Sequence, residues 1–273
     1  MSRRVDYGLR FYREVLKLDS LHFGLWADGD PRTLEGMRIA QQRYTEHLLS
    51  FIPPETRSVL DVGCGTGSTA AQLIERGLEV TCVSPDPYQE ELVRERFDGQ
   101  VECHLACFEE LSTRASYDLI LMSESAQYIK VEAGCRRSHA LLRPDGHLLV
   151  ADYFRKTPSR RYYKTCHVAS EFLDAARRHG LGLVREEDIT QRVLPTLELA
   201  GRLYREHVRP AADIALEYVE SEMPVVWRAA NVLLRGKIRK LRHYVYERFP
   251  EKLDPAKFAE NVRYVIYLFR RSA

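Results

Sequence analysis

Hydrophobic and polar positions along residues 56–189 form two kinds of segment, short continuous apolar runs and longer stretches with helical periodicity. The apolar runs predict strands and the amphipathic stretches predict helices. We expect strands at 58–63, 78–84, 101–108, 117–123, 147–154 and 181–189, with helices at 68–77, 88–97, 135–146 and 170–180. Because the strands are apolar throughout and alternate with helices, they predict an α/β fold with a mostly parallel sheet and helices on both faces.

Two helical segments lie outside this rhythm, and a last β-rich run at 261–271 ends the sequence. Neither helical segment has the Gly/Ser composition of a linker, so we expect one domain overall. The last run would join the sheet as an antiparallel seventh strand. The predicted parts are an N-terminal helical lid segment (1–55), a Rossmann-like core (56–189), a helical cap inserted before the last strand (190–250) and the closing strand region (251–273).

Composition narrows the class of protein. Lys and Arg total 41 against 39 for Asp and Glu, a net charge of +2, so we expect no nucleic-acid partner. No secretory leader opens the chain and no apolar window approaches membrane-spanning length, so we expect no membrane span and a cytoplasmic protein. Residues 235–243, "RGKIRKLRH", form a local basic run. That run is either a solvated helix face or a patch for an acidic substrate or a membrane surface.

The stretch "LDVGCGTG" (60–67) joins the first predicted strand to its helix, at the sheet edge where α/β folds bind ligands. Its glycines at 63, 65 and 67 allow positive φ and close approach of a ligand. A dinucleotide turn instead has G-x-G-x-x-G spacing. Asp61, two residues upstream, would repel a pyrophosphate and suits a cationic ammonium or sulfonium, the charges of S-adenosylmethionine.

With "YDLILMSESAQYI" (117–129) and "LLRPDGHLLVADYF" (141–154), this stretch resembles the class I S-adenosylmethionine-dependent methyltransferases. The resemblance covers residues 56–190 and the last strand. "VSPDPYQ" (83–89) and "LHFGLW" (21–26) are most similar to the cyclopropane-synthase-like and sterol or tocopherol methyltransferases, which act on lipids and small molecules.

The resemblance implies the residues that hold the cofactor. Two usual acidic positions are replaced here: Ser84 ends the second strand, and Cys107 and Phe108 follow the third. The ribose would be held by Asp86 reaching back or by Ser84 with Gln89, and the adenine by backbone at 107–108 with Phe108 packing on the ring. The full set of expected cofactor residues is Asp61, Gly63, Cys64, Gly65, Ser84, Pro85, Asp86, Gln89, Cys107, Phe108, Ser123 and Glu124.

The same resemblance implies candidates near the methyl acceptor. His22 is a base or acceptor-orienting residue, or it only attaches the N-terminal segment to the core, and Trp26 would be a wall. Tyr128, which with Gln127 replaces the Glu-His pair of cyclopropane synthases, argues against cyclopropanation. The expected catalytic residues are His22, Tyr128 and His167, and the expected substrate-binding residues are Trp26, Tyr153 and Trp227.

Taken together, the sequence predicts methyl transfer from S-adenosylmethionine to a hydrophobic small molecule such as a phenolic, polyketide-like or lipid natural product, with S-adenosylhomocysteine as the product. Methylation of oxygen is favoured. Transfer to carbon or nitrogen, a nicotinamide oxidoreductase and a catalytically silent binding protein remain as alternatives. We expect no metal ion, and a homodimer remains open.

Overall fold

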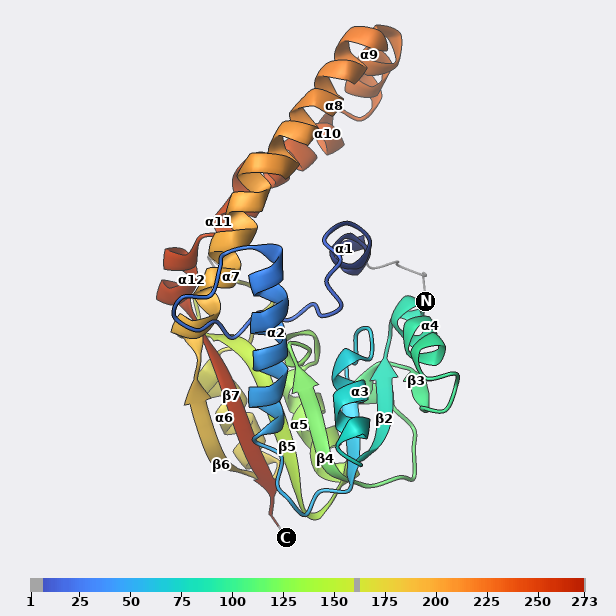
Figure 1. The fold of residues 1–273 in the computed structure, drawn as a ribbon, viewed down its shortest axis with the longest axis vertical. Helices are drawn as coiled ribbons and strands as arrows, with labels where there is room; N and C mark the ends of the chain where they lie inside the picture. Colours follow the sequence, from blue (N-terminus) through green and yellow to red (C-terminus); the bar gives the residue numbers. More distant parts are fainter. Residues whose placement is uncertain (1–6, 160–162, 273) are drawn as a thin grey trace.

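The computed structural model describes residues 7–159 and 163–272. Residues 1–6 of the expected lid segment and residue 273 of the closing region lie outside the described part. Within that part, seven strands form one sheet in the order β3-β2-β1-β4-β5-β7-β6 (Figure 1). The strands are β1 Ser58–Val62, β2 Glu79–Ser84, β3 Cys103–Leu105, β4 Tyr117–Ser123, β5 Leu142–Arg155, β6 Leu181–Asp188 and β7 Val262–Arg271.

The first five strands run parallel, and β7 runs antiparallel between β5 and β6. The predicted fold class is therefore confirmed, including the antiparallel last strand. The helices and short helical turns are α1 Tyr7–Arg10, η1 Phe11–Val15, α2 Leu34–Leu49, α3 Ser68–Glu75, α4 Pro87–Arg96, η2 Phe108–Glu110, η3 Ala126–Tyr128, α5 Val131–Leu141, α6 Ala169–Arg178, α7 Thr190–Leu203, η4 Tyr204–Val208, α8 Arg209–Glu222, α9 Pro224–Leu233, α10 Arg235–His243, η5 Tyr244–Arg248, α11 Phe249–Lys252 and α12 Pro255–Asn261.

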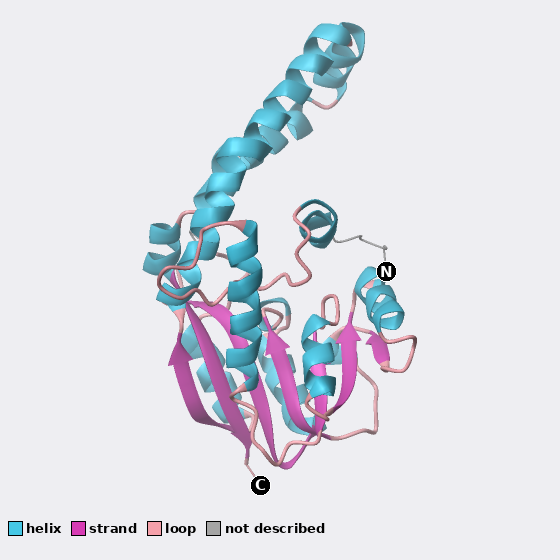
Figure 2. Cartoon of the chain, in the orientation of Figure 1, coloured by secondary structure: helices cyan, strands magenta, loops and turns pink. Residues whose placement is uncertain are grey.

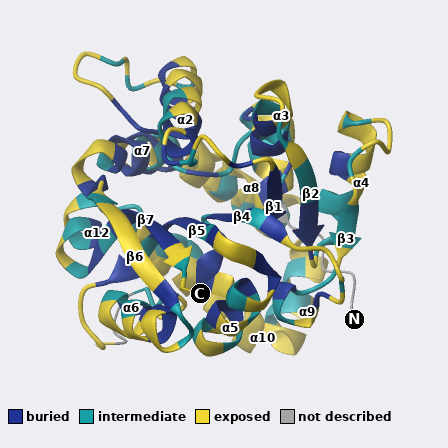
Figure 3. Cartoon of the chain, turned by 90° about the horizontal axis from the view of Figure 1, so that it is seen from below, coloured by how far each residue is buried: buried dark blue, intermediate teal, exposed yellow. Residues whose placement is uncertain are grey.

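Strand β4 shows how the sequence builds two cores. Successive side chains of a strand point to opposite faces of the sheet. Leu119 and Leu121 pack with α2, α3, α7 and α12 on one face, whereas Ile120 and Met122 pack with α5 and α6 on the other. Buried positions accordingly lie between the two helical layers when the sheet is viewed end-on (Figure 3).

Two strands differ from their predicted bounds. Strand β3 covers only 103–105, because the chain then turns into η2 and buries Phe108 against the core. Strand β5 begins at Leu142, before the Pro-Asp-Gly stretch that we expected to end the preceding helix. The stretch forms a bulge within the strand, where Asp145 has a φ of +63° and the pairing with β4 shifts register.

The segment 190–250 is helical as expected, but its two halves differ. Helix α7 packs on the sheet, with Val193 and Leu197 in the core. Helices α8, α9 and α10 leave the sheet and extend as a projection (Figures 1 and 2), and α12 returns to pack on the sheet through Phe258. No helix within residues 7–159 and 163–272 combines the length and apolar character needed to cross a membrane.

Candidate active site

A crevice of about 590 Å³ lies at the carboxyl ends of β1, β2 and β4, a volume typical of small-molecule sites. The carboxyl edge of an open α/β sheet is where ligands bind in such folds. Every cofactor residue expected from the sequence lines this crevice, and so do three of the expected acceptor-side residues, His22, Tyr128 and Tyr153.

The glycine turn between β1 and α3 forms the floor of the crevice. Gly63 has a φ of +77°, and a Cβ there would lie 2.5 Å from the Cβ of Ser125. Gly65 has a φ of +57°, and a Cβ there would meet nothing within 4 Å. Gly63 therefore permits close packing of the protein itself, whereas Gly65 presents bare backbone to the open crevice.

Asp61 places a carboxylate below this turn. Its side chain is 3% exposed, and Oδ2 has no hydrogen-bond partner within the described residues. Burial raises the pKa of Asp61 to about 7. An unpaired buried carboxylate is costly, so the site fits a ligand that brings a cation or N–H and O–H donors. The amino-acid end of S-adenosylmethionine has this chemistry.

The second strand ends in a polar pair. The Ser84 hydroxyl donates to Gln89 Oε1 at 2.8 Å and accepts from the Asp86 backbone N–H at 3.1 Å. The Asp86 carboxylate instead accepts from the Tyr88 N–H and caps α4. The Asp86 oxygen that caps the helix and the Ser84 hydroxyl are thus both engaged within the protein, and all three side chains line the crevice.

Residues 18–26 cross over the crevice and are fastened on both sides of it. The Thr66 hydroxyl donates to the Asp19 carbonyl at 2.6 Å, and the hydroxyls of Ser20 and Ser68 lie 3.1 Å apart. On the opposite side the Phe23 N–H donates to Glu124. Helix α1 and η1, which precede this segment, contribute further lining residues, Gly8, Leu9 and Tyr12.

Glu124 is the centre of a buried network that the sequence did not reveal. Its Oε1 accepts from the Phe23 N–H at 2.6 Å and from the Tyr264 hydroxyl at 2.8 Å. The Tyr264 oxygen lies 2.8 Å from the Tyr44 oxygen, which in turn lies 3.0 Å from the Ser123 hydroxyl. Tyr44 and Tyr264 are ordinary aromatic core positions in a helix and a strand, so no sequence signal separated them from packing residues.

Burial raises the pKa of Glu124 to about 8, well above that of an unfolded glutamate. The folded state therefore binds the proton more tightly, and this contribution to stability is present at low pH and is lost as pH rises toward 8. We expect Glu124→Gln, which keeps the acceptor oxygen, to reduce the fall in unfolding free energy between pH 5 and 8, by at most about 1.4 kcal/mol per pH unit. Urea unfolding at several pH values measures this; equal pH slopes for the two proteins would contradict it.

His22 lines the crevice but is held by the protein. Its Nδ1 donates to the Phe23 carbonyl at 2.9 Å, Nε2 lies 3.2 Å from the Thr45 hydroxyl, and the ring stacks on Tyr44 at 4.3 Å. Burial lowers the pKa of His22 to about 4, so the ring is neutral at pH 7. With both nitrogens engaged, the geometry favours attachment of the N-terminal segment over proton transfer.

Three other candidate residues lie outside the crevice. Trp26 is buried beside α2 and α7, where its indole N–H donates to the Thr196 hydroxyl at 2.9 Å. His167 Nε2 donates to the carbonyls of Ala126 and Ile129, at 2.9 and 2.8 Å, and so fixes the loop after β4. Trp227 lies on α9 in the projection. The structure therefore gives Trp26 and His167 internal bonding roles in place of a wall and a base.

The segment 190–250, which we expected to cap the crevice, also lies away from it. None of the residues lining the crevice comes from the segment 190–250. The crevice is lined instead by residues of α1, η1 and the segment 18–26, and by Tyr128. Tyr128 is 76% exposed, so its ring stands at the rim.

Comparison with known proteins agrees with this geometry. Residues 60–150 match the family described as methyltransferase domain. An O-methyltransferase of Pyrenophora dematioidea is 29% identical over 141 residues, 48% of this chain and 52% of that protein. A ubiquinone biosynthesis O-methyltransferase of Methylocella silvestris is 32% identical over 166 residues, 54% of this chain and 65% of that protein. The chain thus spans about half the length of the first of these relatives.

Solved structures share the whole fold. A putative sarcosine dimethylglycine methyltransferase from Galdieria sulphuraria has a TM-score of 0.73 at 17% identity, covering 98% of this chain and 99% of that one. A cyclopropane synthase from Mycobacterium tuberculosis has a TM-score of 0.68 at 18% identity, covering 98% and 94%. Geranyl diphosphate C-methyltransferase from Streptomyces coelicolor, solved with Mg²⁺, geranyl diphosphate and S-adenosyl-L-homocysteine, has a TM-score of 0.66 at 17% identity, covering 99% and 100%.

These likenesses confirm the family resemblance seen in the sequence. The matched residues 60–150 contain the glycine turn, the strand that ends in the Ser84 pair and the loop that carries Glu124. Residues 60–150 are therefore a methyltransferase domain, on a fold that the chain shares with solved methyltransferases and a cyclopropane synthase.

Proposed function

We propose that this protein transfers a methyl group from S-adenosylmethionine to a hydrophobic small molecule, with an oxygen atom as the favoured acceptor. The observation that carries the proposal is the buried carboxylate of Asp61, whose Oδ2 has no hydrogen-bond partner among the described residues, beneath a glycine turn in a crevice at the carboxyl edge of the sheet. The O-methyltransferases among the sequence relatives support oxygen as the acceptor atom.

Three groups of residues along the crevice would each hold one part of the cofactor. Asp61 with the turn at 63–65 would hold the amino-acid end, and Ser84 with Gln89 would hold the ribose hydroxyls. The backbone at 107–108, with the buried Phe108 beside it, would hold the adenine. Pro85, Asp86, Ser123 and Glu124 also line the cofactor side of the crevice. When bound, the cofactor supplies an electrophilic methyl group on a sulfonium.

Aromatic side chains give the acceptor side of the crevice its character. Phe23 and Tyr153 stack at 5.8 Å and line the crevice together with Tyr12 and Tyr128. Flat apolar walls of this kind favour an aromatic or lipid-like acceptor. Trp227 is too distant along the fold to take part, since it belongs to the projecting helices.

Positioning is the contribution that this site can make to the reaction. Methyl transfer requires in-line alignment of acceptor and methyl carbon, and such alignment can supply several kcal/mol of the barrier. The roof of residues 18–26, fastened to Thr66 and to Glu124, would hold the acceptor and exclude water. With His22 and His167 engaged by backbone carbonyls, we infer that the acceptor proton leaves toward solvent at the rim near Tyr128.

Two measurements test the proposal. Calorimetry should detect binding of S-adenosylhomocysteine at millimolar concentration or below, and NADH should not bind; the opposite result would support the oxidoreductase alternative. Incubation with S-adenosylmethionine and a panel of phenols, carboxylic acids, amines and alkenes should then yield a product heavier by one methyl group. Cofactor binding without any methylated product would indicate a catalytically silent protein.

A further inference from the structure

The projecting helices, residues 209–252, form a helical arm that has no core of its own. The arm comprises α8, α9, α10, η5 and α11, and none of these elements contains a buried residue. Helices α9 and α10 have ten and nine residues. Helices of this length are marginal in water unless an apolar face is packed against something. The arm therefore has surfaces that could pack against a binding partner outside this chain.

The far end of the arm is apolar. Helix α9 lies at this end (Figure 1). We define the arm tip as residues 223–246, which run from α9 back along α8 as far as Tyr246, beside Asp213. Val225 is 78% exposed, and Val232 and Leu233 are each 80% exposed. Further large apolar side chains exposed in the tip are Met223, Val226, Leu234, Leu241 and Tyr244. Grouped apolar exposure of this kind marks an interaction surface.

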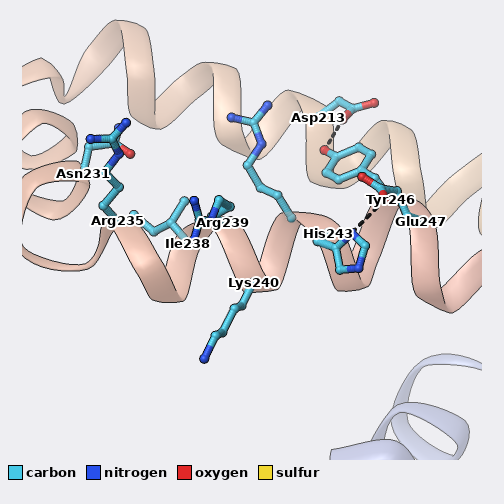
Figure 4. Close-up of a pocket in the computed structure, with 10 residues that line it drawn as sticks. Asp213, Asn231, Arg235, Ile238, Arg239, Lys240, His243, Tyr246 and Glu247 are labelled. Atoms are coloured by element: carbon cyan, nitrogen blue, oxygen red, sulfur yellow. Dashed lines mark hydrogen bonds and ion pairs between the residues drawn. The ribbon is translucent and has the colours of Figure 1, made fainter.

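The same tip is strongly basic. Residues 223–246 contain six Lys and Arg residues and no Asp or Glu, although the whole chain is nearly balanced at 41 against 39. These cations are Arg228, Arg235, Lys237, Arg239, Lys240 and Arg242. Figure 4 shows Lys240 pointing away from the facing helix toward open space.

An open groove of about 860 Å³ runs along the basic side of the tip, lined in part by Arg235, Arg239 and Lys240. The two acidic residues at its edge are already engaged: Asp213 accepts from the Tyr246 hydroxyl, and Glu247 pairs with His243 at 2.7 Å (Figure 4). Helix α10 carries five cations, Arg235, Lys237, Arg239, Lys240 and Arg242, against these two carboxylates, so the net charge on this side of the arm is positive.

We propose that the arm tip docks on the surface of an anionic lipid bilayer. A bilayer interface accepts both features at once, because the apolar side chains enter the headgroup–acyl boundary while the cations meet lipid phosphates. A tip-to-tip dimer of this chain is disfavoured, because it would place the six cations of one tip against the six cations of the other and the like charges would repel. A nucleic acid would leave Val225, Val232 and Leu233 in water. The inference rests on the arm alone and does not depend on the proposed methyl transfer.

Flotation of the full chain with lipid vesicles tests the proposal. We expect the protein to float with phosphatidylcholine vesicles that contain a quarter phosphatidylglycerol, and not with pure phosphatidylcholine, and the binding should weaken as salt is added. Reversing three charges, Lys237→Glu, Arg239→Glu and Lys240→Glu, should reduce partitioning about 100-fold or more, since each cation near the surface contributes roughly fivefold.

A matched control has the same change in net charge on the globular part of the chain. Arg76→Glu, Arg114→Glu and Arg136→Glu alter three exposed residues outside the arm and should retain partitioning within a few-fold of the unmodified protein. Equal loss in both triple variants would overturn the docking site, because it would show dependence on net charge alone.

The apolar part of the proposal has its own test. Val232→Ser with Leu233→Ser should reduce partitioning at least tenfold without changing the helical circular dichroism signal. Fluorescence of the two tryptophans tests the same point. Trp26 is buried in the core, so a blue shift on adding vesicles would come from Trp227 in the arm tip and should vanish in Trp227→Phe. Flotation with neutral and anionic vesicles alike, an unchanged Trp227 signal, or a dimer in light scattering that fails to float would each overturn the proposal.

Discussion

Replacing Asp61 by Asn is expected to weaken binding of S-adenosylhomocysteine roughly 10- to 100-fold. The substitution keeps the shape of the side chain and removes its charge, and hydrogen bonds to a charged group contribute about 1.5–3 kcal/mol. The Oδ2 atom has no partner of its own within the described residues, so the ligand would be the group that satisfies it. Isothermal titration calorimetry of the variant and the unmodified protein measures the difference.

Asp118→Asn is the matched control for this substitution. Asp118 lies on β4 outside the crevice, where its carboxylate accepts from the Ser58 N–H at 2.9 Å and pairs with Arg143 at 2.7 Å. Its replacement should lower stability and leave cofactor affinity unchanged. Because the pKa of Asp61 is raised to about 7, affinity in the unmodified protein should also fall as pH drops below 7, and Asp61→Asn should flatten this dependence. Affinity unaffected by Asp61→Asn would remove this residue from the binding site.

The second large effect is expected from Gly63→Ala, which should lower the free energy of unfolding by about 2–4 kcal/mol. The new Cβ would lie 2.5 Å from the Cβ of Ser125, on a backbone with a φ of +77°. The Ser125 hydroxyl also donates to the Val62 carbonyl, so this neighbour has little freedom to withdraw. Urea unfolding followed by circular dichroism measures the change.

Gly99→Ala separates the cost of steric overlap with a neighbouring side chain from the cost of a positive φ. Gly99 has a φ of +71°, and a Cβ there would meet nothing within 4 Å, so only the backbone conformation is penalised. We expect a loss of about 1 kcal/mol for this variant. If Gly99→Ala cost as much as Gly63→Ala, the close approach of Ser125 would have no measurable effect, and steric overlap would not account for the requirement for glycine at position 63.

The sheet and the cofactor edge could be predicted from the sequence because both depend on local patterns. A central strand is buried on both faces, so a continuous apolar run such as 117–123 predicts one directly. Strand β4 has these bounds in the structure. The turn at 60–67 is similarly local, since the positive φ at 63, 65 and 67 strongly favours glycine.

The acceptor side was harder to predict because it depends on long-range contacts. The sequence shows that His22 and Trp26 adjoin a helix, but it does not show that Trp26 meets Thr196, 170 residues away. Likewise, Tyr264 reaches Glu124 because β7 enters the sheet between β5 and β6. The sequence also predicted a helical cap over 190–250, but it did not show that the helices from α8 to α11 extend away from the crevice.

The position of β7 has a consequence for biosynthesis. Among the described strands β6 pairs with β7 alone, and β7 is synthesised about 75 residues after β6. Until residues 262–271 are translated, β5 presents an open edge and the nascent β6 has nothing to pair with. Maturation of this half of the protein is therefore a late event, and the growing polypeptide would benefit from chaperone protection during that interval.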